Sequence, residues 1–275
     1  MEHLTLPIRS LDYHVRLFNK DGLKKIVLLH GFTGSMKTWE EVIEELPNSL
    51  AILAIDLIGH GKTAKPLEAS RYSVEEQIED LRTIFDQIGW KDFILVGYSM
   101  GGRLALSYAN KYSVAHLILE SSSPGVQDKE AREQRIEADS NLAAMIEKEG
   151  IESFVEYWGN IPLFLSQKKL SLKKRRAIRE ERVSQEEIGL ANSLRGFSTG
   201  IQPSLWDKLD SMIFPVTLVT GAEDKKFCEI AKKMEEILPN VKRITVKEVG
   251  HAIHVENPKL FATIVKEIIL KEELK

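Results

Sequence analysis

The sequence contains a single cysteine, has no strong excess of charge of either sign and lacks a long apolar segment. Cys228 is the only cysteine among 275 residues, which excludes an internal disulfide framework and a cysteine-based metal cluster and fits a reducing cytoplasm. The net charge of −3 gives no overall indication of binding to nucleic acid or to a membrane surface. We therefore expect a cytoplasmic protein with no metal, no nucleic-acid partner and no membrane partner.

Targeting and membrane-spanning segments are also missing from the sequence. Residues 1–7 lack the basic start and following apolar run of a signal peptide. The longest apolar run, about residues 50–58, is interrupted by Asp56 and is too short to cross a bilayer. These observations predict a soluble protein, whose length fits one large α/β domain or a core with an inserted subdomain.

Short apolar runs alternate with helical patterns along most of the chain. Asp12–Phe18 alternates polar and apolar residues and precedes a turn at residues 19–22, as in an edge hairpin. Ser73 and Glu76 form a capping box at the start of one predicted helix. This alternation predicts a mostly parallel sheet with helices on both faces. The predicted strands are residues 26–29, 52–55, 93–97, 114–119, 216–219 and 243–246, and the first helices are about residues 37–46 and 74–88.

Residues 125–204 differ in character from the rest of the chain. They contain charged helical segments with scattered aromatic residues and no apolar strand. We interpret them as a helical cap inserted into a core formed by residues 1–124 and 205–275. Basic residues are frequent in the cap, but Glu180 and Glu181 interrupt the run of basic residues. Few aromatic residues that could stack on bases lie among the basic residues, so nucleic-acid binding is not expected.

The central motif is Gly97-x-Ser99-x-Gly101, which lies between a buried strand and an Ala- and Leu-rich helical segment. Glycines at these positions permit a sharp strand-to-helix turn that exposes a serine hydroxyl beside the free amides of a helix N-terminus. The motif in this setting resembles the nucleophile elbow of an α/β-hydrolase. The predicted fold class is therefore the α/β-hydrolase fold with an inserted helical cap.

A serine needs a histidine to take its proton and a carboxylate to orient that histidine. In this fold the acid and then the histidine follow the serine along the chain, each after a strand. Asp224 follows the strand at 216–219 and is the predicted acid, with Glu223 as the alternative. His251 follows Gly250 at the end of the last strand and is the predicted base, whereas we expect His254 to pack or to cap the closing helix.

The oxyanion hole requires one amide from the residue after the serine and one from the loop after an earlier strand. Met100 and Phe32 supply these amides in our interpretation. We expect His30 to tie down its loop and His60 to be a turn residue. Arg103 stands about one helical turn after Ser99, so its guanidinium can reach the space above the serine. An arginine there favours a substrate that bears carboxylates, although a salt bridge elsewhere would explain it equally well.

Further segments make the likeness more specific. The chain shares three patterns, at residues 29–34, 56–61 and 97–103, with many α/β-hydrolases. From about residue 26 to the C-terminus, cap included, it resembles the 2-succinyl-6-hydroxy-2,4-cyclohexadiene-1-carboxylate synthase family of menaquinone biosynthesis. The segments that carry this resemblance are Glu120–Gly125, Arg132–Asp139, Phe154–Trp158, Gly189–Ala191, Pro203–Trp206 and Gly221–Phe227.

The resemblance implies a lyase that needs no cofactor and releases pyruvate from an enolpyruvyl-bearing cyclohexene. The implied substrate is a small anionic polycarboxylate. We expect the protein to be a monomer or a weak homo-oligomer. Ser99, Asp224 and His251 match the family's triad. The remaining matches are Phe32 and Met100 to the oxyanion loop, Arg103, Arg135 (with Arg132 as its alternative) and Arg182 to substrate arginines, and Tyr98, Tyr157 and Trp158 to aromatic positions near the pocket.

Two other readings use the same residues. A serine esterase, thioesterase or carbon–carbon bond hydrolase would use the triad to form an acyl-enzyme, and the arginines argue against a neutral ester as its substrate. A non-catalytic binding protein of this fold would have lost triad residues, and here all three are present.

Overall fold

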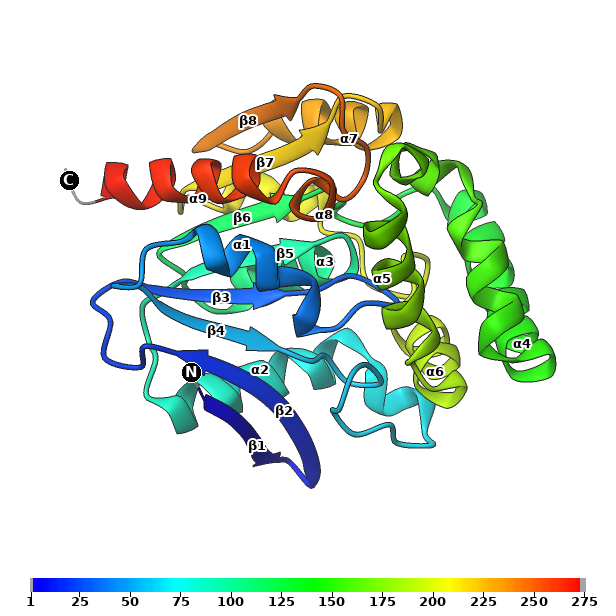
Figure 1. Cartoon of the computed structure of the whole chain (residues 1–275). Coiled ribbons are helices and arrows are strands. Elements are labelled where there is room, and N and C mark those ends of the chain that lie inside the picture. Colours follow the sequence, from blue (N-terminus) through cyan, green and yellow to red (C-terminus); the bar gives the residue numbers. More distant parts are fainter. Residues whose placement is uncertain (1, 273–275) are drawn as a thin grey trace.

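The computed structural model describes residues 2–272, which form one eight-stranded sheet flanked by helices (Figure 1). Its strands pair in the order β1-β2-β4-β3-β5-β6-β7-β8. The six strands β4, β3, β5, β6, β7 and β8 run parallel to one another, whereas the β1–β2 and β2–β4 pairs are antiparallel. The strands are β1 (Glu2–Ile8), β2 (Leu11–Phe18), β3 (Lys25–Leu29), β4 (Ala51–Ile55), β5 (Ile94–Tyr98), β6 (His116–Glu120), β7 (Val216–Gly221) and β8 (Val241–Val246).

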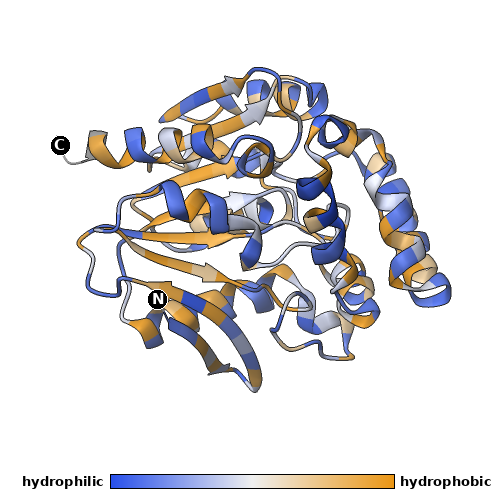
Figure 2. Ribbon diagram, in the orientation of Figure 1, coloured by the Kyte–Doolittle hydropathy of each residue, from blue (hydrophilic) through white to orange (hydrophobic). Residues whose placement is uncertain are grey.

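The two faces of the sheet are covered by different helices. Trp39, Val42 and Phe261 belong to an apolar cluster that packs α1 and α9 on one face. Phe85, Leu104 and Met234 belong to the cluster that packs α2, α3 and α7 on the other. The central strands are mostly apolar in Figure 2, as burial on both faces requires. These helices are α1 (Glu40–Glu45), α2 (Val74–Ile88), α3 (Met100–Lys111), α7 (Lys225–Glu235), α8 (Ile253–Glu256) and α9 (Pro258–Glu272). Shorter 3-10 turns are η1 (Met36–Trp39), η2 (Ala69–Tyr72) and η4 (Trp206–Ser211).

The N-terminal hairpin differs from the prediction. β1 and β2 pair through a turn at Arg9 and Ser10, and the turn at residues 19–22 follows β2 instead of closing a hairpin. Arg9 and Ser10 have φ of 45° and 69°, values at which turns usually carry glycine or asparagine. The sequence therefore lacks the usual signal for this hairpin, and β1 was missed for that reason.

The segment between β6 and β7 lies across the carboxyl ends of the parallel strands (Figure 1). It contains α4 (Lys129–Gly159), η3 (Pro162–Lys169), α5 (Leu172–Val183) and α6 (Glu187–Phe197), and no strand. Gly150 has φ of 80° and interrupts the helical geometry inside α4. Division of the chain into a core and a cap at residues 124/125 and 204/205 stays a prediction. Among residues 2–272, no helix is both long and apolar enough to cross a membrane.

Candidate active site

The turn between β5 and α3 holds Ser99 in a strained backbone conformation, with φ of 49° and ψ of −106°. Its amide donates to the carbonyl of Glu120 at the end of β6 over 2.8 Å. A Cβ on Gly97 would lie 2.5 Å from the carbonyl oxygen of Gly101, and one on Gly101 would lie 2.4 Å from that of His30. Only glycine allows the backbone to approach so closely, which explains the spacing of the motif. Strain of this kind costs about 1–3 kcal/mol and is found where function requires it.

Ser99, His251 and Asp224 form one hydrogen-bonded chain. His251 Nδ1 lies 2.6 Å from Asp224 Oδ2, and His251 Nε2 lies 3.0 Å from Ser99 Oγ. Because a carboxylate can only accept, the histidine proton is on Nδ1 and Nε2 accepts from the serine hydroxyl. His251 is 1 % and Asp224 8 % exposed. The three predicted residues thus come together from three separate strand ends, in the arrangement that activates a serine.

Neither alternative to these residues lies in the chain of hydrogen bonds. Glu223 pairs with Lys169 of η3 at 2.5 Å. His254 is fully buried, and its Nδ1 lies 2.9 Å from a carboxylate oxygen of Glu120. Its Nε2 lies 2.8 Å from Thr38 Oγ1. His254 therefore packs, as expected, and it also forms a second carboxylate–histidine–hydroxyl chain, for which the sequence contains no local signal.

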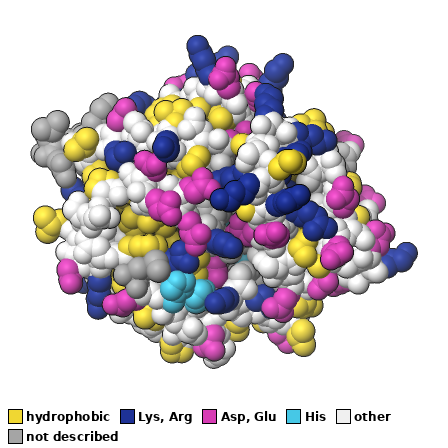
Figure 3. Space-filling model, viewed as in Figure 1, with side chains coloured by type: hydrophobic (Ala, Val, Ile, Leu, Met, Phe, Trp, Pro, Cys, Tyr) yellow, Lys and Arg dark blue, Asp and Glu magenta, His cyan; other side chains and the backbone are white. Residues whose placement is uncertain are grey.

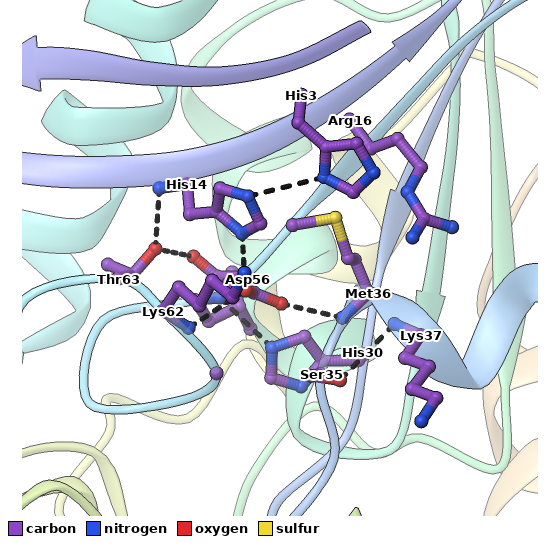
Figure 4. Close-up of polar contacts among 12 residues, drawn as sticks. His3, His14, Arg16, His30, Ser35, Met36, Lys37, Asp56, Lys62 and Thr63 are labelled. Carbon is purple, nitrogen blue, oxygen red and sulfur yellow. Dashed lines mark hydrogen bonds and ion pairs between the residues drawn. The ribbon is translucent and has the colours of Figure 1, made fainter. Parts of the chain in front are cut away.

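The loop after β3 carries Phe32 and is held by residues at the end of β4 (Figure 4). The Leu57 amide donates to His30 Nε2 over 3.0 Å, and the Met36 amide donates to Asp56 Oδ1 over 2.7 Å. Asp56 Oδ2 accepts from His14 Nδ1 over 3.0 Å. These contacts confirm His30 as a residue that ties down its loop. The same loop passes beside the elbow, since a Cβ on Gly31 would lie 3.5 Å from Ser99 Cβ.

The amides of Met100 and Phe32 stay candidates for the oxyanion hole. Met100 is the first residue of α3, where amides have no acceptor within the helix. The ring of Phe32 is held by the cap, with ring centroids of Phe154 and Trp158 at 6.2 Å and 5.5 Å. On the other side of the loop, Ser35 donates from its amide and its hydroxyl to Glu181 of α5. The sheet and the cap therefore fix this loop together.

A cavity of about 980 Å³ opens above Ser99, between the strand ends and the cap. Tyr98, Tyr157 and Trp158 line it, as do Arg103 and Arg135. Trp158 Nε1 is buried and has no hydrogen-bond partner within residues 2–272. Tyr157 is 51 % exposed. All three predicted aromatic residues therefore border one space large enough for a drug-sized ligand.

Arg103 reaches this cavity, but its guanidinium is already engaged. Nη1 bonds to Gln202 Oε1, and Nη2 donates to the carbonyl of Phe197 over 3.0 Å. The guanidinium carbon lies 4.4 Å from the centre of the Phe197 ring. Burial, and next the charge of Arg135, lower the pKa of Arg103 to about 9. An anionic ligand beside Arg103 would offset both effects, because a nearby negative charge favours the charged form of the guanidinium.

Arg135 presents its guanidinium differently. Its Nε donates to Asp139 Oδ2 one turn later on α4 over 2.6 Å. Its Nη atoms make no hydrogen bond within residues 2–272, and both residues line the cavity. The alternative, Arg132, donates to the carbonyls of Gly200 and Ile201 and so braces the end of the cap. The spacing of four residues between Arg135 and Asp139 on a helix is the sequence signal that could have indicated their pairing.

Arg182 does not line the large cavity. It is 9 % exposed, donates to Gln167 Oε1 over 3.2 Å and lies 4.5 Å from the centre of the Phe164 ring. It borders a smaller cavity of about 50 Å³ behind Tyr98 and Phe164. Its predicted contact with substrate is untested, and the structure separates it from Arg103 and Arg135.

Charge on the cap surface is mixed. In Figure 3, Lys and Arg side chains gather over α5 with Asp and Glu side chains beside them. Within residues 2–272, no cluster of three or more histidine, cysteine or acidic side chains is arranged to hold a metal ion.

Comparisons with known proteins give consistent results. The alpha/beta hydrolase fold family matches residues 24–258. A protein of Bacillus subtilis (strain 168), provisionally named a 2-succinyl-6-hydroxy-2,4-cyclohexadiene-1-carboxylate synthase, is 46 % identical over 89 % of each chain. The synthase of that name from Enterobacter sp. (strain 638) is 31 % identical over 91 % of this chain and 93 % of its own.

Solved structures agree with the sequence relatives. The structure of MenH from S. aureus superposes with a TM-score of 0.90 and 35 % identity, covering 95 % of this chain and 99 % of that one. A thermophilic esterase from Thermogutta terrifontis has a TM-score of 0.85 over 98 % of this chain and 99 % of its own. At 22 % identity, that esterase shows the shared fold alone.

Proposed function

Because the chain belongs to the 2-succinyl-6-hydroxy-2,4-cyclohexadiene-1-carboxylate synthase family within the alpha/beta hydrolase fold, we propose that it is a carbon–oxygen lyase of menaquinone biosynthesis. It converts 2-succinyl-5-enolpyruvyl-6-hydroxy-3-cyclohexene-1-carboxylate into 2-succinyl-6-hydroxy-2,4-cyclohexadiene-1-carboxylate and pyruvate. One observation carries this proposal: the Ser99–His251–Asp224 chain lies at the base of a cavity that Arg135 also lines, an arginine whose Nη atoms make no hydrogen bond within residues 2–272.

Ser99 is the base in the proposed reaction. His251 Nε2 takes the hydroxyl proton, and Ser99 Oγ takes the ring proton next to the succinyl carbonyl. The electron pair moves through the ring double bond, and the carbon–oxygen bond to the enolpyruvyl group breaks. The amides of Phe32 and Met100 hold the enolate oxygen while charge is on it. The leaving enolate takes a proton from His251 and becomes pyruvate, so no acyl-enzyme forms and no cofactor is needed.

The arginines explain why this substrate suits this cavity. The substrate carries several carboxylates, and a guanidinium binds a carboxylate through two parallel hydrogen bonds. Arg135 and Arg103 supply positive charge beside an uncharged nucleophile. We further propose that the enzyme acts in the cytoplasm as a monomer or weak homo-oligomer.

A serine esterase, thioesterase or carbon–carbon hydrolase that acts on an anionic substrate is the second candidate. The hydrogen-bonded triad supports it equally, because the same three residues can form an acyl-enzyme. The proposed lyase differs in a measurable way, since it releases pyruvate and never acylates Ser99.

The test measures pyruvate release from the named substrate, coupled to lactate dehydrogenase. We expect turnover by the wild type and a loss of at least about 10³-fold in Ser99→Ala, as is usual for removal of a triad serine. Ser107→Ala is the matched control, because Ser107 lies on the helix that Ser99 precedes, and within residues 2–272 its hydroxyl bonds only to the Arg103 carbonyl. A burst of nitrophenolate from p-nitrophenyl esters without pyruvate release would favour the hydrolase.

A further inference from the structure

A second buried chain of polar groups runs behind Tyr98. Glu120 ends β6, and its side chain and that of His254 are both fully buried. Glu120 Oε1 accepts from the His254 amide over 3.0 Å and from His254 Nδ1 over 2.9 Å. His254 Nε2 in turn accepts from the Thr38 hydroxyl over 2.8 Å. None of these three side chains takes part in the reaction proposed above.

This chain connects the three segments that carry the reacting groups. The backbone carbonyl of Glu120 accepts from the Ser99 amide, so the same residue holds the nucleophile elbow. Its carboxylate holds the first turn after His251 through the amide and the ring of His254. Thr38, at the far end, belongs to η1, which follows the Phe32 loop and bonds back to Ser35. Glu120 thus holds the nucleophile elbow through its backbone carbonyl, and through its carboxylate it links the segment of the base to η1 after the oxyanion loop.

The burial of this group calls for an explanation beyond stability. Glu120 Oε2 has no hydrogen bond within residues 2–272, although His254 Nδ1 lies 2.9 Å from it. A buried carboxylate–histidine pair adds little net stability, because desolvation of the carboxylate offsets the hydrogen bonds that it accepts. Such a pair does, however, impose a unique geometry, since a shift of either partner leaves a buried polar group unpaired.

Tyr98 separates this chain from the triad. Its ring centroid lies 4.6 Å from that of His254 and 5.3 Å from that of His251. Trp39 also packs against the His254 ring, with ring centroids 4.3 Å apart. The His254 ring is therefore in contact with two aromatic rings, and its displacement would be passed to Tyr98 and to the loop that carries His251.

We propose that Glu120, acting through His254, is a positioning residue that sets the distance between Ser99 and His251. The proposal rests on the proposed function only for the roles of Ser99 and His251. Glu120 touches no substrate, so its loss should change the rate of the reaction and leave substrate binding nearly intact.

The decisive variant is Glu120→Leu, which fills the same space without acceptor oxygens. A displacement of about 1 Å in a catalytic group lowers the rate about 100-fold, so we expect kcat to fall about 10–100-fold with KM changed less than about threefold. Glu120→Gln keeps Oε1 as an acceptor for His254 and should restore kcat to within about fivefold of the wild type.

Asp80→Leu is the matched control, because Asp80 on α2 is another fully buried carboxylate, which pairs with Arg71 at 2.6 Å and does not line the cavity. It should lower the melting temperature as Glu120→Leu does and leave kcat within about twofold. If Glu120→Leu does not fold, Thr38→Val breaks the far end of the chain and should lower kcat about threefold or more. A kcat within about twofold of the wild type in folded Glu120→Leu or, where that variant does not fold, in Thr38→Val, or a loss carried by KM, would overturn the proposal.

A second readout separates this proposal from the lyase assignment. Phosphonylation of Ser99 by a fluorophosphonate needs Ser99, His251 and the oxyanion amides but no carboxylate-bearing substrate. The labelling rate should fall in Glu120→Leu by the same factor as kcat, whatever the natural substrate is. If the wild type labels Ser99 but releases no pyruvate, the lyase proposal fails. If wild type and Glu120→Leu label equally fast, the positioning proposal fails.

Discussion

Replacement of Asp224 by asparagine tests the triad at its most buried contact. Asp224 accepts two hydrogen bonds through different oxygens, from His251 Nδ1 at Oδ2 over 2.6 Å and from the Phe227 amide at Oδ1 over 3.3 Å. The second bond caps the N-terminus of α7. An asparagine has one acceptor oxygen and one donor nitrogen, so it can satisfy only one of these two donors.

The competition between the two bonds fixes the expected magnitude. If the amide oxygen faces Phe227, the cap is kept, and the amide nitrogen forces His251 to carry its proton on Nε2. Nε2 then cannot accept from Ser99. The opposite orientation keeps the productive tautomer but loses the cap, worth about 1 kcal/mol, and places two donors face to face at a further 1–3 kcal/mol or so. The unproductive orientation is favoured. A wrong tautomer of this kind lowered kcat about 10⁴-fold in a serine protease, so we expect a loss of about 10³–10⁴, or about 4–5.5 kcal/mol in the barrier.

The assay is single-turnover pyruvate release, with unfolding by urea measured on the same samples. Asp224→Asn should lose kcat with KM little changed and should unfold nearly as the wild type does, because the cap survives. Asp224→Ala should lose a similar factor in kcat and also about 1 kcal/mol of stability. Glu223→Gln should stay within about threefold of the wild type, since Glu223 pairs with Lys169 and lacks a partner in the triad. A loss below about tenfold in folded Asp224→Asn, or a loss equal in Glu223→Gln, would refute the reasoning.

Two further predictions concern the cavity and the pH dependence of stability. Arg135→Gln removes the Nη atoms, which make no hydrogen bond within residues 2–272, and should raise KM about tenfold or more. Arg132→Gln breaks the bonds to the carbonyls of Gly200 and Ile201 and should mainly lower stability. Equal KM values for the two variants in steady-state kinetics would contradict the assignment of Arg135 to substrate binding. Burial lowers the pKa of His60 to about 3 in the folded protein, whereas its pKa in the unfolded chain is near 6.5. Between these two pH values only the unfolded chain protonates His60, so the free energy of unfolding decreases as the pH falls, by about 2 kcal/mol at pH 5. His60→Gln should flatten that slope in urea unfolding between pH 7 and 5, and an unchanged slope would argue against the buried neutral ring.

The fold was largely readable from local patterns. Every predicted strand of the parallel sheet forms within a few residues of its expected position, and α2 begins at Val74 with Ser73 capping the amide of Glu76, as the capping box predicts. Short apolar strands that alternate with helices are stable when the sheet is buried between two layers of helices. The hairpin turn at Arg9 and Ser10 could not be predicted, because both residues have positive φ and neither is the glycine or asparagine that usually marks such a turn.

The sequence by itself determined which residues occupy the strand ends, and therefore that Ser99, Asp224 and His251 share one edge of the sheet. It could do so because strand order and the position of each residue after a strand are local properties. What each side chain bonds to was decided only by the tertiary structure, because those contacts join residues far apart in the chain. Packing of the cap against the sheet assigned Arg135 to the cavity and Arg182 to a separate space, and it brought Glu120 to His254 across 134 residues.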